Sequence, residues 1–344
     1  MRIDPPAKVL VTGSAGFIGF HLSRELIRRG YQVVGIDNLN NYYSVELKRD
    51  RLKELVGSPG FEFHQMDFSV AEDVSSLFDR HRFDAVAHLG AQAGVRFSIE
   101  SPSAYIQSNV VGTAHLLEAA RKTPARHFVY ASSSSVYGMN SKLPFDESDP
   151  VDHPISLYAA TKKSCELIAH TYSHLHGLPT TGLRFFTVYG PWGRPDMALF
   201  KFTTAILEGL PIDVYNQGIM RRDFTYVDDI VAGTADVLAG PAEPEQDWNP
   251  STPRPNTSSA PYRIYNIGNH QSVELTRFIE VLEGALGKRA QLNLLPMQPG
   301  DVPETYAAID RLHEATGYLP TTPIEVGIPK FVEWYRAYYG LAER

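Results

Sequence analysis

The sequence predicts an α/β fold: a doubly wound parallel sheet with a smaller carboxy-terminal lobe. Over the first 190 residues, short β-branched apolar runs alternate with segments of helical spacing. The runs are apolar throughout, which is typical of strands buried on both faces of a parallel sheet. Right-handed crossovers between such strands place helices on both faces of the sheet.

The predicted elements follow one another in the order that this fold requires. The predicted strands are KVLVT, YQVVGID, FEFHQMD, FDAVAHLG, HFVYASSS and TTGLRFF. Helices are predicted over residues 17–29, 105–121 and 156–175, where apolar residues recur with helical spacing. The first of these helices stops at Gly30, as helices often do.

The regular alternation ends near residue 190, after which proline and glycine separate shorter elements such as a helix over 276–286. We therefore predict a first domain over 1–190, to which some later segments return, and a smaller lobe formed mainly by residues 191–344. Residues 241–261 are rich in proline and polar side chains and nearly lack aliphatic ones, which predicts a mobile surface insertion.

The composition argues against several classes of function. The chain has 344 residues and a net charge of −7, and its basic residues are scattered, so we expect no nucleic-acid partner. No apolar run is long enough to span a bilayer, and the first residues lack the order of a signal peptide. The single cysteine, Cys165, fits a cytoplasmic protein. No Cys/His spacing predicts a metal site.

A glycine-rich turn joins the first predicted strand to the first helix. It contains Gly13, Gly16 and Gly19, and the N-terminus of the helix offers N–H groups to a pyrophosphate. Asp37 ends the second strand, where a carboxylate accepts from ribose hydroxyls and favours NAD over NADP. Asp67, after the third strand, can reach an adenine amino group or cap the following helix; both interpretations stay open.

Tyr158 and Lys162 lie one turn apart on a predicted helix. A lysine ammonium beside a tyrosine favours the tyrosinate, which can act as a general base. Such pairs are also common on helix surfaces, so the pair alone does not show whether Tyr158 is a catalytic base or an ordinary surface residue. The stretch ASSSSVYG (131–138) ends a strand at the carboxyl edge of the sheet, where its hydroxyls can meet a substrate alcohol.

Taken together, these motifs resemble the extended short-chain dehydrogenase/reductases of the NAD-dependent epimerase/dehydratase family, with their Rossmann-like fold. The resemblance covers nearly the whole chain, and it implies that the domain over 1–190 binds NAD and that residues 191–344 form mainly the lobe that binds the UDP-sugar. It rests on TGSAGFIG, LGAQAGVRFS, SNVVGT, ASSSSVYG, YAATK, LRFFTVYGPWGRPDMA, RRDFTYVDD and PGDVPET.

The resemblance implies roles for individual residues. Tyr158 is implied as the base, Lys162 as the ligand of the nicotinamide ribose, and Ser133 as a hydrogen-bond partner of the sugar hydroxyl. The implied NAD-binding residues also include Gly13, Gly16, Phe17, Ile18, Gly19, Asp37, Asn38, Asp67, Phe68, Leu89, Ala91, Asn109 and Ser132. The implied substrate-binding residues are Arg96, Ser134, Ser135, Thr187, Arg194, Tyr215, Arg222 and Asp301.

Within the family, the serine stretch favours a 4-epimerase acting on a UDP-sugar. The 4,6-dehydratases carry an Asp-Glu pair where this chain has Ser134 and Ser135. The chain is most similar to UDP-glucuronate 4-epimerases, and the asparagine of UDP-glucose 4-epimerases is replaced by Thr187. Gln298 stands where the UDP-glucose 4-epimerases usually have an arginine, so phosphate binding is expected to depend more on Arg222. The alternatives are a UDP-glucose 4-epimerase, a UDP-glucuronate decarboxylase and a non-catalytic NAD-sensing protein.

Two further expectations concern the substrate carboxylate and the assembly. Arg96 and Arg194 are the candidates for holding a C6 carboxylate, and we favour Arg194. The helices over 105–121 and 156–175 resemble those that pair across a dimer in this family, so we expect a homodimer.

Overall fold

The computed structural model describes residues 2–298 and 300–341. Its central sheet has seven parallel strands in the order β10-β6-β5-β4-β1-β2-β3, which confirms the predicted doubly wound fold. The strands are β1 (Lys8–Thr12), β2 (Gln32–Asp37), β3 (Phe61–Gln65), β4 (Ala85–His88), β5 (His127–Ser133), β6 (Thr180–Phe185) and β10 (Tyr262–Ile267).

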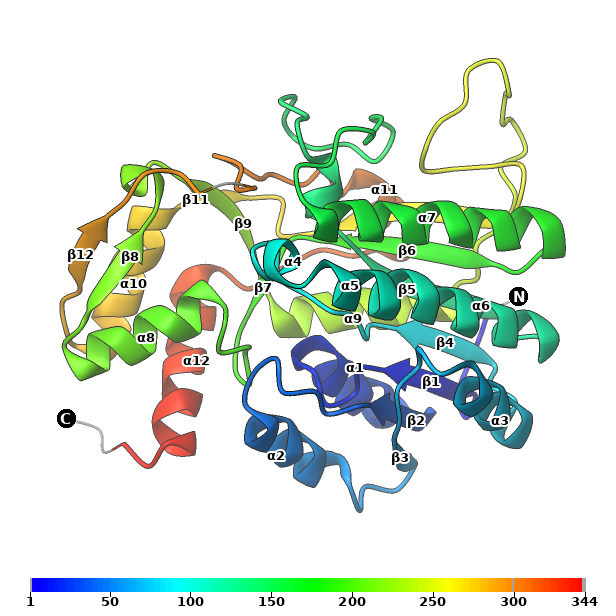
Figure 1. Cartoon of the computed structure of the whole chain (residues 1–344), viewed down its shortest axis with the longest axis horizontal. Coiled ribbons are helices and arrows are strands. Elements are labelled where there is room, and N and C mark those ends of the chain that lie inside the picture. Colours follow the sequence, from blue (N-terminus) through cyan, green and yellow to red (C-terminus); the bar gives the residue numbers. More distant parts are fainter. Residues whose placement is uncertain (1, 299, 342–344) are drawn as a thin grey trace.

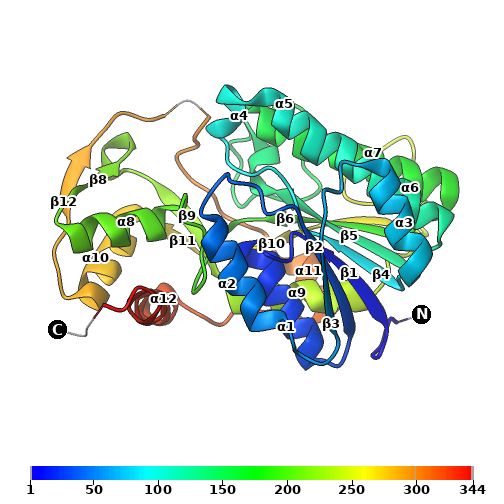
Figure 2. The same ribbon diagram turned by 60° about the horizontal axis from the view of Figure 1, so that its bottom comes forward.

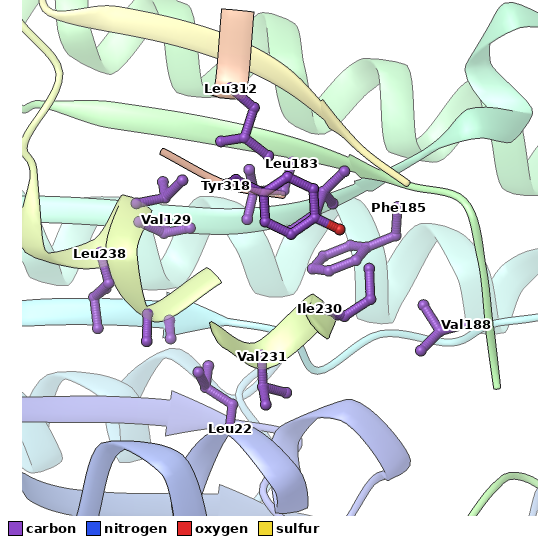
Figure 3. Close-up of a cluster of buried hydrophobic side chains, with 14 of the residues drawn as sticks. Leu22, Val129, Leu183, Phe185, Val188, Ile230, Val231, Leu238, Leu312 and Tyr318 are labelled. Atoms are coloured by element: carbon purple, nitrogen blue, oxygen red, sulfur yellow. The ribbon is translucent and has the colours of Figure 1, made fainter. Parts of the chain in front are cut away.

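Helices cover both faces of this sheet (Figure 2). One layer contains α1 (Phe17–Arg28), α9 (Val227–Ala239) and α11 (Asp310–Thr316), with α2 (Val45–Leu55) beside α1. The other layer contains α3 (Ala71–His81), α6 (Gly112–Lys122) and α7 (Leu157–His176). Figure 3 shows the core of the first layer, in which Leu22 of α1 lies next to Val231 of α9, and Val129 and Leu183 of the sheet belong to the same cluster.

The helix over 156–175 has clear start and stop signals. Ser156 is its N-cap, and the Ser156 hydroxyl accepts a hydrogen bond from the N–H of Ala159 at 3.1 Å. Gly177 ends the helix in the left-handed region, at φ 65°. Tyr158 and Lys162 therefore occupy its first turns, close to the carboxyl edge of the sheet.

The segment over 105–121 is helical but is not one regular α-helix. It comprises α5 (Pro102–Tyr105), the π-helical η1 (Ile106–Val111) and then α6, with α4 (Phe97–Glu100) before it. Within η1, the Asn109 side chain bonds the backbone of Gln92 and the hydroxyl of Thr161. π-helical turns often occur at functional sites, and here one holds the loop after β4 against α7.

The second lobe lies at one end of the molecule (Figure 1). It contains a three-stranded sheet of β7 (Thr187–Tyr189), β9 (Arg221–Tyr226) and β11 (Ser272–Glu274), and a parallel pair of β8 (Pro211–Val214) and β12 (Gln291–Leu294). Its helices are α8 (Ala198–Glu208), α10 (Leu275–Leu286) and α12 (Ile324–Tyr338). Two 3₁₀ turns complete the elements: η2 (Ser134–Tyr137) and η3 (Asn216–Gly218).

Residues 241–261 form an irregular loop without helix or strand. Glu245 forms an ion pair with Arg263 at 3.3 Å, and Ser258 bonds His170 at 2.9 Å, so both halves of the loop contact the main body. The mobility of this loop stays a prediction. None of the helices in the described part of the chain is both long enough and apolar enough to cross a membrane.

Candidate active site

A cavity of about 480 Å³ opens at the carboxyl edge of the seven-stranded sheet, facing the second lobe. Such a volume suits a small-molecule or cofactor site, and open α/β sheets bind ligands at this edge. The wall of the cavity contains every residue that the sequence analysis assigned to the site except Asp67, Arg96, Asn109 and Tyr215.

These four residues lie close to the cavity but outside its wall. Asp67 accepts a hydrogen bond from Asn38 at 2.8 Å and does not cap α3, whose N-cap is Val70. Asn109 is buried behind the wall. Arg96 lies over the ring of Tyr215 at 4.4 Å. Arg96 also forms an ion pair with Asp301, at 3.3 Å.

The glycine turn leaves no room for side chains. Gly13 has φ 70°, and a Cβ there would lie 2.8 Å from the Cα of Gly90. A Cβ on Gly19 would lie 2.1 Å from the carbonyl oxygen of Gly13. The backbone is therefore packed tightly against itself, and α1 begins directly at the cavity wall, as a pyrophosphate-binding turn requires.

Asp37 ends β2 at the cavity wall. Its carboxylate accepts the N–H of Leu39 at 2.8 Å. Burial raises the pKa of Asp37, and the charge of Lys48 opposes this shift. Lys48 itself donates to the carbonyl and side-chain oxygens of Asn40, both at 2.8 Å. The carboxylate is thus a nearly buried acceptor, only 8% exposed, and suited to ligand hydroxyl groups.

Tyr158 and Lys162 both line the cavity. The Lys162 ammonium lies 5.9 Å from the centroid of the Tyr158 ring and donates to the carbonyl of Ala131 at 2.8 Å. The Tyr105 ring meets Tyr158 edge to face, at 6.1 Å between centroids. Two neighbours therefore hold the tyrosine beside a fixed positive charge at the end of β5.

The serines that follow β5 have different partners. Ser132 donates to Glu166 at 2.7 Å, and Glu166 forms a buried bidentate ion pair with Arg184. Ser133 accepts the N–H of Ser135 at 3.2 Å. Ser132 is thus fixed by a buried charge network, whereas the hydroxyl hydrogen of Ser133 remains available for a ligand.

Two arginines line the opposite wall, and their surroundings differ. Arg194 forms a bidentate ion pair with Asp196, through Nε at 3.0 Å and through Nη2. Arg222 donates to the carbonyls of Arg221 and Pro303, at 2.9 and 3.1 Å. Burial lowers the pKa of Arg222, although the charge of Asp301 opposes this shift. Both walls of the cavity thus present polar groups from distant parts of the sequence.

Sequence reasoning missed several residues of the wall, among them Tyr42, Lys48 and Gln92. Gln92 is 7% exposed, and its Nε2 has no hydrogen-bond partner among the described residues. Gln92 belongs to the motif LGAQAGVRFS, and this membership was the one feature of the sequence that could have pointed to it. Tyr42 and Lys48 carried no signal, because they belong to the loop and helix after β2 rather than to a motif.

One group of three metal-ligand side chains occurs among the described residues, although the sequence spacing predicted none. Glu62, His64 and His81 bring one ligand atom each to within 4.8 Å of one another. They lie on β3 and at the end of α3, and none lines the cavity. His81 is too far from His64 in sequence for spacing to reveal the group.

Comparisons with known proteins agree with this geometry. Residues 9–268 match the model of the NAD dependent epimerase/dehydratase family. Protein CapI of Staphylococcus aureus is 55% identical over 96% of this chain and 99% of its own. A probable UDP-glucuronate 4-epimerase of Rhizobium meliloti is 47% identical over 96% of this chain and 98% of its own.

A solved structure of similar shape is the UDP-glucuronic acid 4-epimerase of Bacillus cereus in complex with UDP-glucuronic acid and NAD. The two align with a TM-score of 0.85 and 34% identity, over 96% of this chain and 100% of the other. From its sequence, fold and cavity, the chain belongs to the NAD dependent epimerase/dehydratase family.

Proposed function

We propose that this protein catalyses the NAD-dependent 4-epimerisation of a UDP-sugar, with UDP-glucuronate and UDP-galacturonate as the interconverted pair. The observation that carries the proposal is a single cavity. It joins the glycine turn, the pair Tyr158 and Lys162, and the polar wall of Thr187 and Arg194.

The residues of the wall at the glycine turn fit NAD. The turn at Gly13 and Gly19 has no space for a Cβ, so backbone N–H groups can approach a pyrophosphate. Asp37 offers a nearly buried carboxylate to ribose hydroxyls, which also disfavours a 2′-phosphate. When bound there, NAD supplies the reversible transfer of a hydride from and to C4 of the sugar.

The chain's own residues move the proton and hold the sugar. Tyr158, beside the Lys162 ammonium, takes the proton of the C4 hydroxyl and later returns it. Ser133 donates to the same oxygen. The second lobe, with Arg222 and its forked guanidinium, binds the diphosphate. The 4-keto sugar turns over inside the cavity before C4 is reduced on its other face.

The preference for glucuronate rests on the wall opposite the glycine turn. The 4-keto form of a glucuronate is a β-keto acid, which loses carbon dioxide when its C5–C6 bond aligns with the carbonyl π system. Arg194 and the hydroxyls of Thr187, Ser134 and Ser135 offer donors that fix the carboxylate out of this alignment. Arg96 is the weaker candidate, because it lies outside the wall and pairs with Asp301.

Incubation of the purified protein with UDP-glucuronate and, separately, with UDP-glucose tests the proposal, with the products separated by chromatography. We expect UDP-galacturonate as the main product and little conversion of UDP-glucose. A main product of UDP-galactose would support a UDP-glucose 4-epimerase. A pentose product would support a decarboxylase, and no conversion would support an NAD-sensing protein.

We also propose a cytoplasmic homodimer that pairs through η1, α6 and α7. Ile106, Leu167 and Leu175 lie on these helices and are 44%, 58% and 65% exposed, which is costly for a free surface. Light scattering at micromolar concentration should give the mass of a dimer, and Leu167→Glu should shift it toward the monomer. A wild-type protein that is only monomeric would contradict this assembly.

A further inference from the structure

The segment that carries Arg194 is fixed at its backbone. Arg51 of α2 is fully buried, and its guanidinium donates to the carbonyls of Trp192 and Gly193, at 2.7 and 3.3 Å. The same guanidinium also donates to the carbonyl of Ala15 in the glycine turn, at 2.9 Å. The backbone just before Arg194 is therefore tied to the cofactor side of the cavity.

The head of Arg194 is fixed as well. Asp196 accepts from Nε and Nη2, which together form one edge of the planar guanidinium. Tyr42 donates to the same carboxylate at 3.3 Å, from the loop after β2. Arg194 and Tyr42 line the cavity, whereas Asp196 does not. Asp196 thus lies behind the arginine and determines its plane.

This arrangement leaves one edge of the guanidinium for a ligand. Nη1 has no hydrogen-bond partner among the residues that the structure describes. A guanidinium can bind one carboxylate at the Nε/Nη2 edge and a second at the edge formed by its two terminal nitrogens. With the first edge occupied by Asp196, an incoming carboxylate meets Arg194 in one orientation only.

The charges give Asp196 a second effect. Burial opposes ionisation of Asp196, but the charge of Arg194 keeps the pKa of this carboxyl below its usual value. The ion pair is therefore formed before any substrate arrives, and it cancels much of the attraction of Arg194 for an anion. The ion pair thus weakens the binding of a substrate carboxylate but fixes the direction from which Arg194 binds it.

We propose that Asp196 is a positioning residue that, with Tyr42, orients Arg194 so that the C6 carboxylate of a uronate is held against decarboxylation. The proposal rests on the function proposed above. In the reaction that it prevents, the C5–C6 bond breaks and its electron pair forms the enolate of the C4 ketone. Carbon dioxide leaves, and a proton then adds at C5 to give a 4-keto pentose.

Asp196→Asn separates this role from a merely structural one. The variant removes the counter-charge and leaves Arg194 free to turn. We expect UDP-glucuronate to bind as tightly as before or more tightly in calorimetry, because the arginine is no longer neutralised. The ratio of pentose to epimer should rise about tenfold or more, as expected for the loss of a charged hydrogen bond. Binding and turnover of UDP-glucose should change little.

Two further variants complete the test. Tyr42→Phe removes only the hydroxyl that supports Asp196, so it should shift the product ratio in the same direction by a smaller factor. It also serves if Asp196→Asn does not fold. Asp247→Asn is the matched control, because Asp247 is exposed and outside the cavity wall.

Each outcome has one meaning. An unchanged ratio of pentose to epimer in both Asp196→Asn and Tyr42→Phe would overturn the role of Asp196. Equal losses of binding for both nucleotide sugars would also overturn it, because they would indicate structural damage. A wild-type protein that epimerises no UDP-sugar would refute the proposed function itself, and calorimetry on both sugars would still report whether Asp196 affects carboxylate binding.

Discussion

The two walls of the cavity are built by different means. The wall at the glycine turn is made of backbone, and its parts are close in sequence: Gly13 and Gly19 touch each other, and α1 follows directly. The opposite wall is made of long side chains whose supports are distant. Arg194 depends on Asp196 and, through it, on Tyr42, which precedes it by some 150 residues. The first wall is therefore readable as a motif, whereas the second depends on tertiary contacts.

Tyr158, at the junction of the two walls, gives the largest expected effect. Tyr158→Phe removes the proposed base and keeps the ring that packs on Tyr105, so the fold should persist. Turnover of UDP-glucuronate should fall by about 10²–10⁴-fold while NAD stays bound. Tyr172→Phe, farther along α7, is the control. Near-normal turnover of the Tyr158 variant would remove the tyrosine from the mechanism.

The side-chain wall is tested next by Arg194→Lys. Lysine keeps the charge but cannot grip a carboxylate at two points. Activity on UDP-glucuronate should fall about 10- to 100-fold, the range expected for lost hydrogen bonds to a charged group. Any activity on UDP-glucose should fall less. Arg221→Lys, outside the cavity wall, controls for a general effect of arginine loss. Equal losses on both sugars would instead place Arg194 at the diphosphate.

The backbone wall is tested by Gly19→Ala. The added Cβ would lie 2.1 Å from the Gly13 carbonyl oxygen, so the turn must shift. We expect a loss of about 1–3 kcal/mol in stability and a lower NAD content in the purified protein, measured after denaturation. Gly284→Ala in α10 meets no atom within 4 Å and should be neutral or stabilising. If Gly19→Ala keeps as much NAD as Gly284→Ala, the turn tolerates a side chain at position 19.

The last and most limited effect, on stability alone, concerns the residue next to Arg222. This residue, Asp223, is fully buried and accepts the N–H of Asn269 at Oδ1, at 2.6 Å, and that of Ala307 at Oδ2, at 3.1 Å. Asp223→Asn must turn an amide N–H₂ toward one of these donors, which should cost about 1–3 kcal/mol in urea unfolding. A variant as stable as wild type would show that the hydrogen-bonded contact between β9 and residues 305–307 tolerates rearrangement.

The comparison of the walls also explains what the sequence could predict. Alternating strands and helices were enough for the parallel sheet, and the motifs were enough for most of the cavity wall. Strand order was not accessible, since β10 joins the sheet next to β6 after a long excursion. The π-helical turn at 106–111 was missed because helical spacing alone does not distinguish it from an α-helix, and the contacts of Asn109 within it are made with distant segments. Asp196 was overlooked although it lies two residues after Arg194.

Isotope transfer tests the central claim most directly, namely that C4 of a UDP-sugar is oxidised and reduced within one cavity. UDP-glucuronate carrying deuterium at C4 is incubated with the purified protein, and the UDP-galacturonate formed is examined by mass spectrometry and NMR. If the claim holds, deuterium remains at C4 of the product without exchange with solvent. Loss of the deuterium to water, or inversion at another carbon, would contradict it.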